Sequence, residues 1–335
     1  MTGIPPFSFF IPFRLYDTLM DLRRLCGINL RSIDNFFDLS LLDKVVVMTR
    51  REDFADVREA VKSQEYRFQV EVLCEDVHYP CLAGCGGSGW FRQQVLKLSC
   101  ADFIRSQYVI LSDDDVVITR SVGRTELFHG DRLVMSHLEA GNATLSSYFD
   151  SSCFLLDYPR ERIHAGQRVL NVTPEIMVTA ELKNVMLDLQ RRWKVKDTRL
   201  FLMEVSRGWS SPLPNHRIRD RVRNRLTVHH RNRMRKIRER AQNWSEYTLY
   251  WAYLLREDRT DYYYDYNVDE HARQLNDEGI WSNDEAVFIG IDGWMERTFG
   301  KGHQHCFTVL SARVNCWDRE QLYQRIEEEL RKARS

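Results

Sequence analysis

The stretch Tyr108-Val-Ile-Leu-Ser-Asp-Asp-Asp-Val-Val-Ile118 carries the strongest signal of fold and function in the chain. Four apolar residues are followed by Ser112 and three aspartates, and apolar character then resumes. A buried strand over 108–111 explains the pattern if it ends at a ligand site, since open α/β sheets bind ligands at the carboxyl ends of their strands. The alternative is an ordinary acidic turn, because Asp is common in turns.

Three adjacent carboxylates repel one another, so a bound cation is the simplest reason to place them together. Alternate side chains of an extended chain face the same way. We therefore expect Asp113 and Asp115 to converge and Asp114 to point elsewhere. Hard oxygen ligands favour Mg²⁺ or Mn²⁺, ions that usually bridge to substrate phosphates.

Strand and helix patterns alternate through the first third of the chain, which predicts an α/β fold with a mostly parallel sheet and helices on both faces. Short apolar runs predict strands, and apolar residues at helical spacing predict helices. The predicted strands are 7–13, 44–49, 69–73 and 108–111, and the predicted helices are 16–26, 53–63 and 90–104.

The second half is less regular and forms a C-terminal extension of the predicted core. Strands are predicted at 133–138, 152–156, 286–291 and 307–314, and helices at 182–193, 245–255 and 318–333. We divide the chain into an α/β core, residues 1–216, and a second part that completes it, residues 217–335. A single domain is the alternative.

Composition excludes several classes of protein. With 335 residues, 43% of them hydrophobic, the chain is no disordered protein. Its 48 basic residues equal its 48 acidic residues, so no nucleic acid is expected as a partner. No apolar run approaches the roughly 20 residues of a membrane-spanning helix, and no secretion signal is seen. We expect a cytoplasmic protein whose eight scattered cysteines are reduced thiols.

Two oppositely charged runs lie in the second half. Residues 217–240 hold eleven Arg and Lys side chains, and residues 257–278 are acidic and rich in tyrosine. The simpler interpretation is two solvated surfaces that pair with each other. The alternative is that 217–240 binds anionic lipid or a phosphate-bearing substrate, which would place the protein at the inner face of the cell membrane.

A glycine-rich entry precedes the predicted helix that starts near Gly89. Trp90, Gln93 and Lys97 fall on one face of this helix. The entry, together with Arg92 and Lys97, could hold an anion. The alternative is an ordinary amphipathic helix with its lysine in solvent.

The segments Gly89-Trp-Phe-Arg-Gln-Gln-Val-Leu-Lys-Leu98 and Tyr108–Ile118 together resemble DUF6492, a bacterial family of predicted glycosyltransferases. That family is similar to nucleotide-sugar-dependent enzymes of the GT-A type, a Rossmann-like fold, and carries a D-x-D motif. Asn171-Val-Thr-Pro-Glu-Ile-Met177 and Trp244-Ser-Glu-Tyr-Thr-Leu-Tyr250 resemble two later segments of the family. The Arg-rich run and the last 80 residues do not resemble it.

The resemblance implies that Asp113 and Asp115 hold Mn²⁺ or Mg²⁺ against the diphosphate of a sugar nucleotide. It implies a late histidine as a further metal ligand, and we name His303 and His305, with His229 and His230 as other candidates. The expected donor-binding residues are Arg14, Trp90, Gln93, Gln94, Lys97 and Asp113. For Arg14 the alternative is a salt bridge to Asp17.

An inverting transferase also needs a base that deprotonates the acceptor hydroxyl. Glu246 is the first candidate and Glu175 the second; a retaining enzyme needs no such base. The alternative role of Glu246 is structural, in a capping box with Asn243 as the N-cap.

The resemblance thus implies a metal-dependent, hexosyltransferase-type glycosyltransferase acting on a nucleotide-sugar donor and a cell-surface polysaccharide or glycolipid acceptor. A nucleotidyltransferase is one alternative, but the glycine-rich loop expected after its first strand is absent from Phe13-Arg14-Leu15-Tyr16. An RNA- or membrane-associating protein that uses residues 217–240 is another.

Overall fold

A five-stranded sheet forms the centre of the computed structural model, with strand order β10-β4-β1-β2-β3. Its strands are β1 (Phe7–Phe13), β2 (Leu42–Thr49), β3 (Val70–Cys74), β4 (Tyr108–Leu111) and β10 (Glu175–Val178). Four of them are parallel and β10 runs antiparallel to β4. The predicted α/β class with a mostly parallel sheet is therefore confirmed.

The structure describes residues 6–83, 85, 89–134, 137–139, 143–170, 173–206, 233–265, 283–300, 305–310 and 316–334.

Buried apolar runs explain why these segments form the inner strands. All seven residues of β1 are buried, and Val45–Met48 in β2 have no exposed surface. Parallel strands covered on both faces have this continuous apolar pattern. Phe10 of β1 lies opposite Val46 of β2 and Leu111 of β4, so the carboxyl ends of all three strands meet at one edge.

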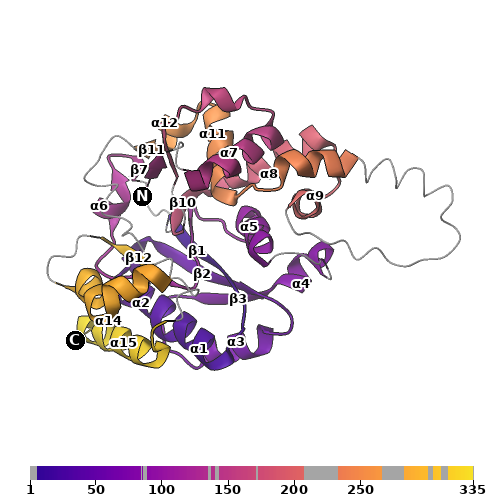
Figure 1. Ribbon diagram of the computed structural model, residues 1–335. Coiled ribbons are helices and arrows are strands. Elements are labelled where there is room, and N and C mark those ends of the chain that lie inside the picture. The colour runs from indigo at the N-terminus through magenta and orange to yellow at the C-terminus, as the bar shows by residue number, and fades with distance from the viewer. Residues whose placement is uncertain are drawn as a thin grey trace, which may run out of the picture.

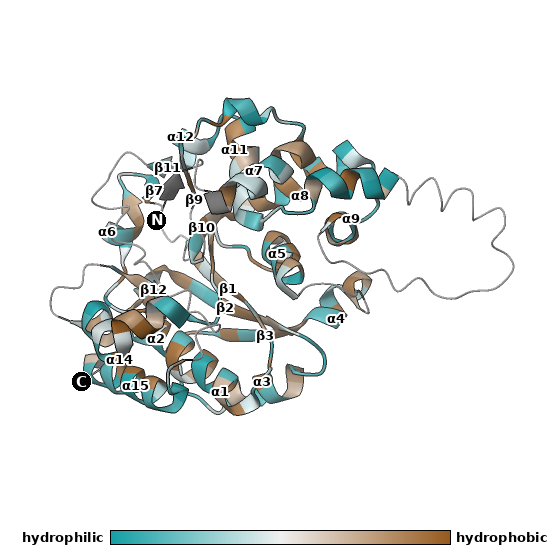
Figure 2. Ribbon diagram, viewed as in Figure 1, coloured by the Kyte–Doolittle hydropathy of each residue, from teal (hydrophilic) through white to brown (hydrophobic). Residues whose placement is uncertain are grey.

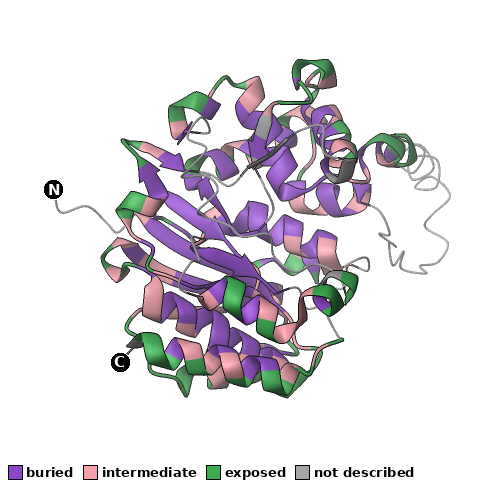
Figure 3. Ribbon diagram, turned by 60° about the vertical axis from the view of Figure 1, so that its left-hand side comes forward, coloured by how far each residue is buried: buried purple, intermediate pink, exposed green. Residues whose placement is uncertain are grey.

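Helices cover both faces of the sheet (Figure 1). Figure 3 shows the sheet as a buried layer between half-exposed helices. One face carries α1 (Thr18–Leu22), the π-helical turn η1 (Arg23–Asn29), α2 (Leu30–Phe36), α3 (Phe54–Lys62), α14 (Asn283–Phe299) and α15 (Arg319–Arg334). The other carries α5 (Gly89–Ser99), α7 (Ala143–Leu156), α8 (Thr179–Trp193), α9 (Thr198–Val205) and α11 (Glu246–Arg256).

Smaller sheets and turns complete the described chain. β12 (Phe307–Val309) pairs with β5 (Val116–Ile118), and β8 (His137–Glu139) pairs with β9 (Arg168–Leu170). A three-stranded sheet has the order β11-β7-β6, with β6 at Phe128–His129, β7 at Arg132–Val134 and β11 at Tyr264–Asp265. Short helices are α4 (Glu75–His78), α6 (Arg124–Leu127) and α12 (Thr260–Tyr263).

Two of the predicted strands in the second half are wrong, because residues 152–156 lie inside α7 and residues 286–291 lie inside α14. The predicted strand 133–138 is confirmed in its described residues, which belong to two strands, β7 and β8. Short apolar runs fit a buried helix as well as a strand, and only tertiary contacts separate the two. The predicted helices at 182–193, 245–255 and 318–333 are confirmed in α8, α11 and α15.

Residues from both sides of position 216 share one hydrophobic core. Trp244 and Trp251, in the second part, are buried in the same cluster as Phe7 and Phe9 of β1. Arg23 of η1 also forms ion pairs with the last helix, at 2.7 Å to Glu327. This continuity favours the single-domain alternative for the described residues.

Apolar positions line the strands and the inner sides of the helices, whereas α15 is largely hydrophilic on its outer surface (Figure 2). No helix in the described ranges has the length and apolar character needed to cross a membrane. All eight cysteines are free thiols, as predicted.

Ile326→Ala should lower the free energy of unfolding by about 2–4 kcal/mol, because Ile326 of α15 has no exposed surface and its truncation leaves a cavity. Urea denaturation followed by circular dichroism measures the loss. Glu328→Ala, at an exposed position of the same helix, is the matched control and should change stability by less than about 0.5 kcal/mol. Equal stability of the two variants would show that α15 does not support the core.

Candidate active site at the carboxyl end of β4

The acidic turn after β4 is fastened to the η1 helix by one buried amide. Asn29 Nδ2 donates to the carbonyl oxygens of Val116, at 2.8 Å, and of Asp113, at 3.3 Å. The hydroxyl of Ser112 also donates to the Asp113 carbonyl, at 3.0 Å. These bonds fix the backbone of the turn, so the three aspartate side chains leave it in set directions.

Asp114 points towards η1. Arg24 Nε donates to Asp114 Oδ2 at 2.8 Å, and the same guanidinium lies 3.0 Å from Asp21. Burial raises the pKa of Asp114, and the charge of Arg24 opposes this rise. Asp114 is thus engaged in a structural ion pair, which agrees with the prediction that it points away from the other two aspartates.

Asp113 is bound on the opposite side by a buried lysine of α5. Lys97 Nζ lies 2.8 Å from Asp113 Oδ1 and 3.1 Å from Glu246 Oε1. Tyr247 adds its hydroxyl at 3.2 Å from the same nitrogen. Lys97 is 2% exposed and Glu246 has no exposed surface, so this cluster is closed to solvent except on the side of Asp113.

The cluster of Asp113, Lys97 and Glu246 holds two carboxylates against one ammonium group. Burial disfavours the charged lysine, but the charges of Asp113 and Glu246 outweigh it and raise the pKa of Lys97 well above its usual range. Burial raises the pKa of Glu246, and Lys97 offsets only part of that rise. The second carboxyl oxygen, Glu246 Oε2, has no hydrogen-bond partner among the described residues. Asp113 therefore shares its lysine with a second, fully buried carboxyl group.

Glu246 stands at the first position of α11 and is not part of a capping box. Ser245 is the N-cap and exchanges hydrogen bonds with Thr248, so the alternative with Asn243 as the cap is wrong. Gln94 accepts a hydrogen bond from the backbone N–H of Glu246 at 3.2 Å. Gln94, predicted to bind the donor, is itself buried and joins α5 to α11 in this way.

The predicted anion site at the start of α5 is also largely occupied by internal contacts. Arg92 is buried in an ion pair with Glu75, and Lys97 is held by Asp113 and Glu246. Trp90 and Gln93 are half-buried on the same helix, with the Trp90 ring 5.7 Å from that of Tyr148. The two cations therefore position their neighbours and do not face solvent.

An aromatic side chain that the motifs did not single out lies at the end of β1. Tyr16 is 80% exposed, and the guanidinium of Arg14 lies 5.1 Å from its ring centre. A Cβ atom on Gly89, where α5 begins, would be 3.7 Å from the Tyr16 hydroxyl. Arg14 forms no ion pair with Asp17, which instead caps α1. Only the exposure of the Tyr16 ring beside Arg14 marks it as a candidate ligand contact, and exposure cannot be read from the sequence.

The segment at 173–178 reaches the acidic turn through a threonine. The N–H of Asp113 donates to Thr173 Oγ1 at 3.0 Å. Glu175, the second candidate base, begins β10 opposite Leu111 and is 2% exposed. Thr173 was quoted in the sequence motif but given no role, and the structure makes it a support for Asp113.

The histidine predicted to complete a metal site lies far from Asp115. Leu310 donates its N–H to the Asp115 carbonyl at 3.0 Å, whereas the His305 carbonyl accepts from Thr119 at the other end of β5. Thr119 is four residues from Asp115, about 13 Å in an extended strand. This geometry argues against His305 as a ligand beside Asp115. His303, His229 and His230 lie outside the described residues.

Asp113 and Asp115 both lie in the turn after β4 and are half-buried. Over the described ranges, no three His, Cys, Asp or Glu side chains form a ready-made metal site. Two hard oxygen ligands suit Mg²⁺ or Mn²⁺, which commonly take one or two carboxylates and complete their shell with water and phosphate.

The chain belongs to DUF6492, a family of unknown function, which it matches over residues 8–331. No curated protein matches it in sequence. Among solved structures, mouse xyloside xylosyltransferase 1 (apo form) is similar at TM-score 0.45 and 10% identity, over 93% of this chain and 99% of that one. The apo-form glycosyltransferase GlyE of Streptococcus pneumoniae TIGR4 is similar at TM-score 0.39 and 10% identity, over 97% of this chain and 62% of that one.

Lys97→Met should destabilise the protein by about 3–5 kcal/mol, because it leaves the buried carboxyl of Glu246 without its partner. In this variant the folded state holds the Glu246 proton more tightly than the unfolded state, whose pKa is near 4.5. The variant should therefore lose stability relative to the wild type as the pH rises above about 4.5. Urea titrations at pH 4 to 8 measure both effects.

The double variant Lys97→Met/Glu246→Gln is the matched control, since it removes the stranded charge together with its partner. It should be more stable than Lys97→Met alone at pH 7 and should lose the added pH dependence. A double variant less stable than the single one would contradict the ion pair.

Proposed function

We propose that this protein is a metal-dependent glycosyltransferase that moves a sugar from a nucleotide-sugar donor to a glycan acceptor. The observation that carries the proposal is the arrangement of Asp113 and Asp115 after β4, with Asp113 held by Lys97 and Asp114 withdrawn by Arg24. Two half-buried carboxylates at the carboxyl edge of a mostly parallel sheet form a site for a divalent cation and the diphosphate it carries.

The donor nucleotide is proposed to lie between the ends of β1 and β4. These strands are parallel neighbours, so Arg14 and Tyr16 after β1 lie at the same edge of the sheet as the aspartates after β4. The exposed ring of Tyr16 offers a stacking surface for a base, and Arg14 offers positive charge to a phosphate. Trp90 and Gln93, near the start of α5, are the remaining predicted donor contacts.

Asp113 and Asp115 fit the cation that this chemistry requires. Both are carboxylate oxygen donors in the turn after β4, the ligand type that Mg²⁺ and Mn²⁺ prefer. When bound, Mn²⁺ or Mg²⁺ would neutralise the charge that develops on the departing nucleoside diphosphate. The chain's own part is to hold the two carboxylates in place: Lys97 and Thr173 orient Asp113, and Asn29 fixes the turn.

Glu246 is proposed to act mainly through Lys97. Its carboxyl has no exposed surface and is bound to the ammonium group, so it reaches no acceptor hydroxyl in this conformation. A catalytic base role for Glu246 or for the buried Glu175 stays a prediction, and it applies only if the enzyme inverts configuration. We assign Glu246 as a positioning residue that fixes the charge of Lys97 beside Asp113.

The acceptor is proposed to be a cell-surface polysaccharide or glycolipid and the transferred group a hexose. Peripheral binding to the inner face of the cell membrane would use the basic run 217–240. Only residues 233–240 of that run are described; they are helical, with Met234 and Ile237 buried and Arg233 and Arg235 exposed. Charge attraction between such a surface and anionic lipid would hold the enzyme near a lipid-linked acceptor.

Asp115→Asn should lower metal-dependent donor turnover at least about 100-fold while leaving the thermal unfolding curve near that of the wild type, because Asp115 is half-buried. Released nucleoside diphosphate measures the rate. Glu65→Gln, at an exposed position between α3 and β3 at the amino edge of the sheet, also removes one negative charge and should leave the rate unchanged. Near-normal turnover in Asp115→Asn would remove Asp115 from the site.

A thermal-shift screen of nucleoside diphosphates, each with and without Mn²⁺, tests the donor site directly. A ligand at 100 times its Kd stabilises the folded state by about 2.7 kcal/mol. We expect one diphosphate to raise the melting temperature only when Mn²⁺ is present, and Asp115→Asn to abolish the shift. No shift with any diphosphate would refute the proposal.

A further inference from the structure

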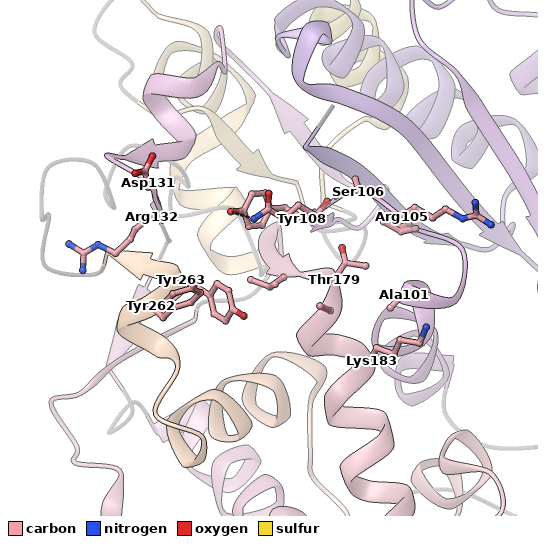
Figure 4. Close-up of a pocket in the computed structure, with 14 residues that line it drawn as sticks. Ala101, Arg105, Ser106, Tyr108, Asp131, Arg132, Thr179, Lys183, Tyr262 and Tyr263 are labelled. Atoms are coloured by element: carbon pink, nitrogen blue, oxygen red, sulfur yellow. Dashed lines mark hydrogen bonds between the residues drawn. The ribbon is translucent and has the colours of Figure 1, made fainter. Parts of the chain in front are cut away.

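A cavity lies at the opposite edge of the sheet from the acidic turn. It has a volume of about 620 Å³ and opens between the start of β4, the start of α8 and α12 (Figure 4). Tyr108 at this end and Asp113 at the other are five residues apart, about 16 Å along an extended chain. The cavity is therefore separate from the proposed donor site.

The antiparallel direction of β10 brings a helix N-terminus to this cavity. Val178 at the end of β10 lies opposite Tyr108 at the start of β4, and α8 begins at the next residue. No side chain caps this 15-residue helix. The Thr179 N–H donates to the Gln107 carbonyl, and further N–H groups of the first turn lack partners within the helix. Such an end carries positive potential and binds anions.

The hydroxyl of Thr179 provides an independent sign of a ligand. Thr179 is 8% exposed and lines the cavity, yet its Oγ1 has no hydrogen-bond partner among the described residues. In Figure 4 Thr179 lies at the start of α8, between the labelled Tyr108 and Lys183. A buried hydroxyl without a partner is costly, so a ligand oxygen that bonds to it would be stabilised.

The charges around the opening favour an anion. Arg105 and Lys183 flank it, are exposed, and form no ion pair with any described residue. Arg132 is already engaged by Asp265 at 2.8 Å. Asp131 is the one acidic side chain of the lining and is fully exposed at its rim.

The acidic residue of the first turn of α8 does not cancel this potential. Glu181 is neutralised by Arg259 at 2.7 Å and accepts a hydrogen bond from Tyr263, also at 2.7 Å. Two cations and an uncapped helix end therefore remain available to a ligand.

Aromatic rings form the remaining wall. Tyr262 is 76% exposed and packs edge-on against Tyr263, and both come from α12 opposite Thr179 (Figure 4). Tyr108 lies above them, with its hydroxyl 2.9 Å from Gln107 Nε2. Tyrosine offers a flat apolar face with a polar tip, which suits a ring that carries hydroxyl groups on its edge.

We propose that this cavity is a binding site for an anionic saccharide, with its phosphate or carboxylate at the start of α8 and its sugar ring against Tyr262 and Tyr263. The sugar part of the inference rests on the proposed glycosyl transfer, because an acceptor glycan would supply it; the anion part stands on the cavity alone. Binding here would hold an acidic acceptor chain at a second point, away from the reacting end.

Isothermal titration of the full-length protein with glucose 1-phosphate, glucuronate, glucose and inorganic phosphate tests the site. We expect saturable binding of glucose 1-phosphate, of glucuronate or of both, and at least tenfold weaker binding of glucose and of inorganic phosphate. The anionic sugar that binds more tightly shows whether the site prefers a phosphate or a carboxylate. Absence of saturable binding by both, or equal affinity for inorganic phosphate and glucose 1-phosphate, would overturn the proposal.

Three variants locate the bound sugar. Thr179→Val keeps the shape of the side chain and should weaken binding about fivefold to tenfold, and Arg105→Ala/Lys183→Ala at least tenfold with a smaller salt dependence. Lys62→Ala, an exposed lysine at the end of α3, is the matched charge control and should bind as the wild type does. If Thr179→Val does not fold, Arg105→Ala/Lys183→Ala tests the site, because both side chains are exposed. Unchanged affinity of this double variant for the anionic sugar would refute the site.

Asp115→Asn separates this proposal from the donor site. The variant should lose Mn²⁺-dependent binding of nucleoside diphosphate and keep the affinity for the anionic sugar. Loss of sugar binding in Asp115→Asn would place the sugar at the donor site and overturn the inference. Sugar binding without any nucleotide binding by the wild type would leave this site standing and refute the proposed transferase.

Discussion

The ammonium group of Lys97 is the contact on which the candidate active site depends. A charge that is 2% exposed must be paired, and its partners come from two distant parts of the chain, Asp113 after β4 and Glu246 at the start of α11. The three segments can be buried together only if their charges meet. This requirement joins the first α/β units to the helical second half and holds Asp113 at the edge of the sheet.

The three aspartates have different partners because helices on the two faces of the sheet present different cations to the turn. Arg24 in η1 forms an ion pair with Asp114 on one face of the sheet, and Lys97 in α5 forms an ion pair with Asp113 on the other. Lys97 is paired with Asp113 on one side and with the buried Glu246 on the other. Under the proposed function, Asp113 and Asp115 would bind the divalent cation that carries the diphosphate.

The sequence predicted most of the central sheet and part of the site. The runs at 7–13 and 44–49 are mostly apolar, broken only by Ser8 in the first and by Lys44 and Thr49 at the ends of the second, a pattern with few alternatives when helices flank it on both sides. The run at 152–156 has the same character but lies in a helix, since only contacts with α8 and α11 decide its state. Asp113 and Asp115 stood out because they follow a strand. The sequence predicts Lys97 as an anion ligand because burial of a lysine leaves no mark in a single sequence, and the exposure of the Tyr16 ring leaves none either.

The direction of one strand explains why the sheet has two edges with different chemistry. After a parallel strand, a helix begins at the carboxyl edge, so helix N-termini and polar turns gather where Asp113 and Asp115 lie. Since β10 is antiparallel, the helix that follows it begins at the amino edge and brings its positive end to Thr179. Negative side chains mark the first edge and an uncapped helix with Arg105 and Lys183 marks the second. A ligand with a cation and a ligand with an anion would thus be sorted to opposite sides of the same sheet.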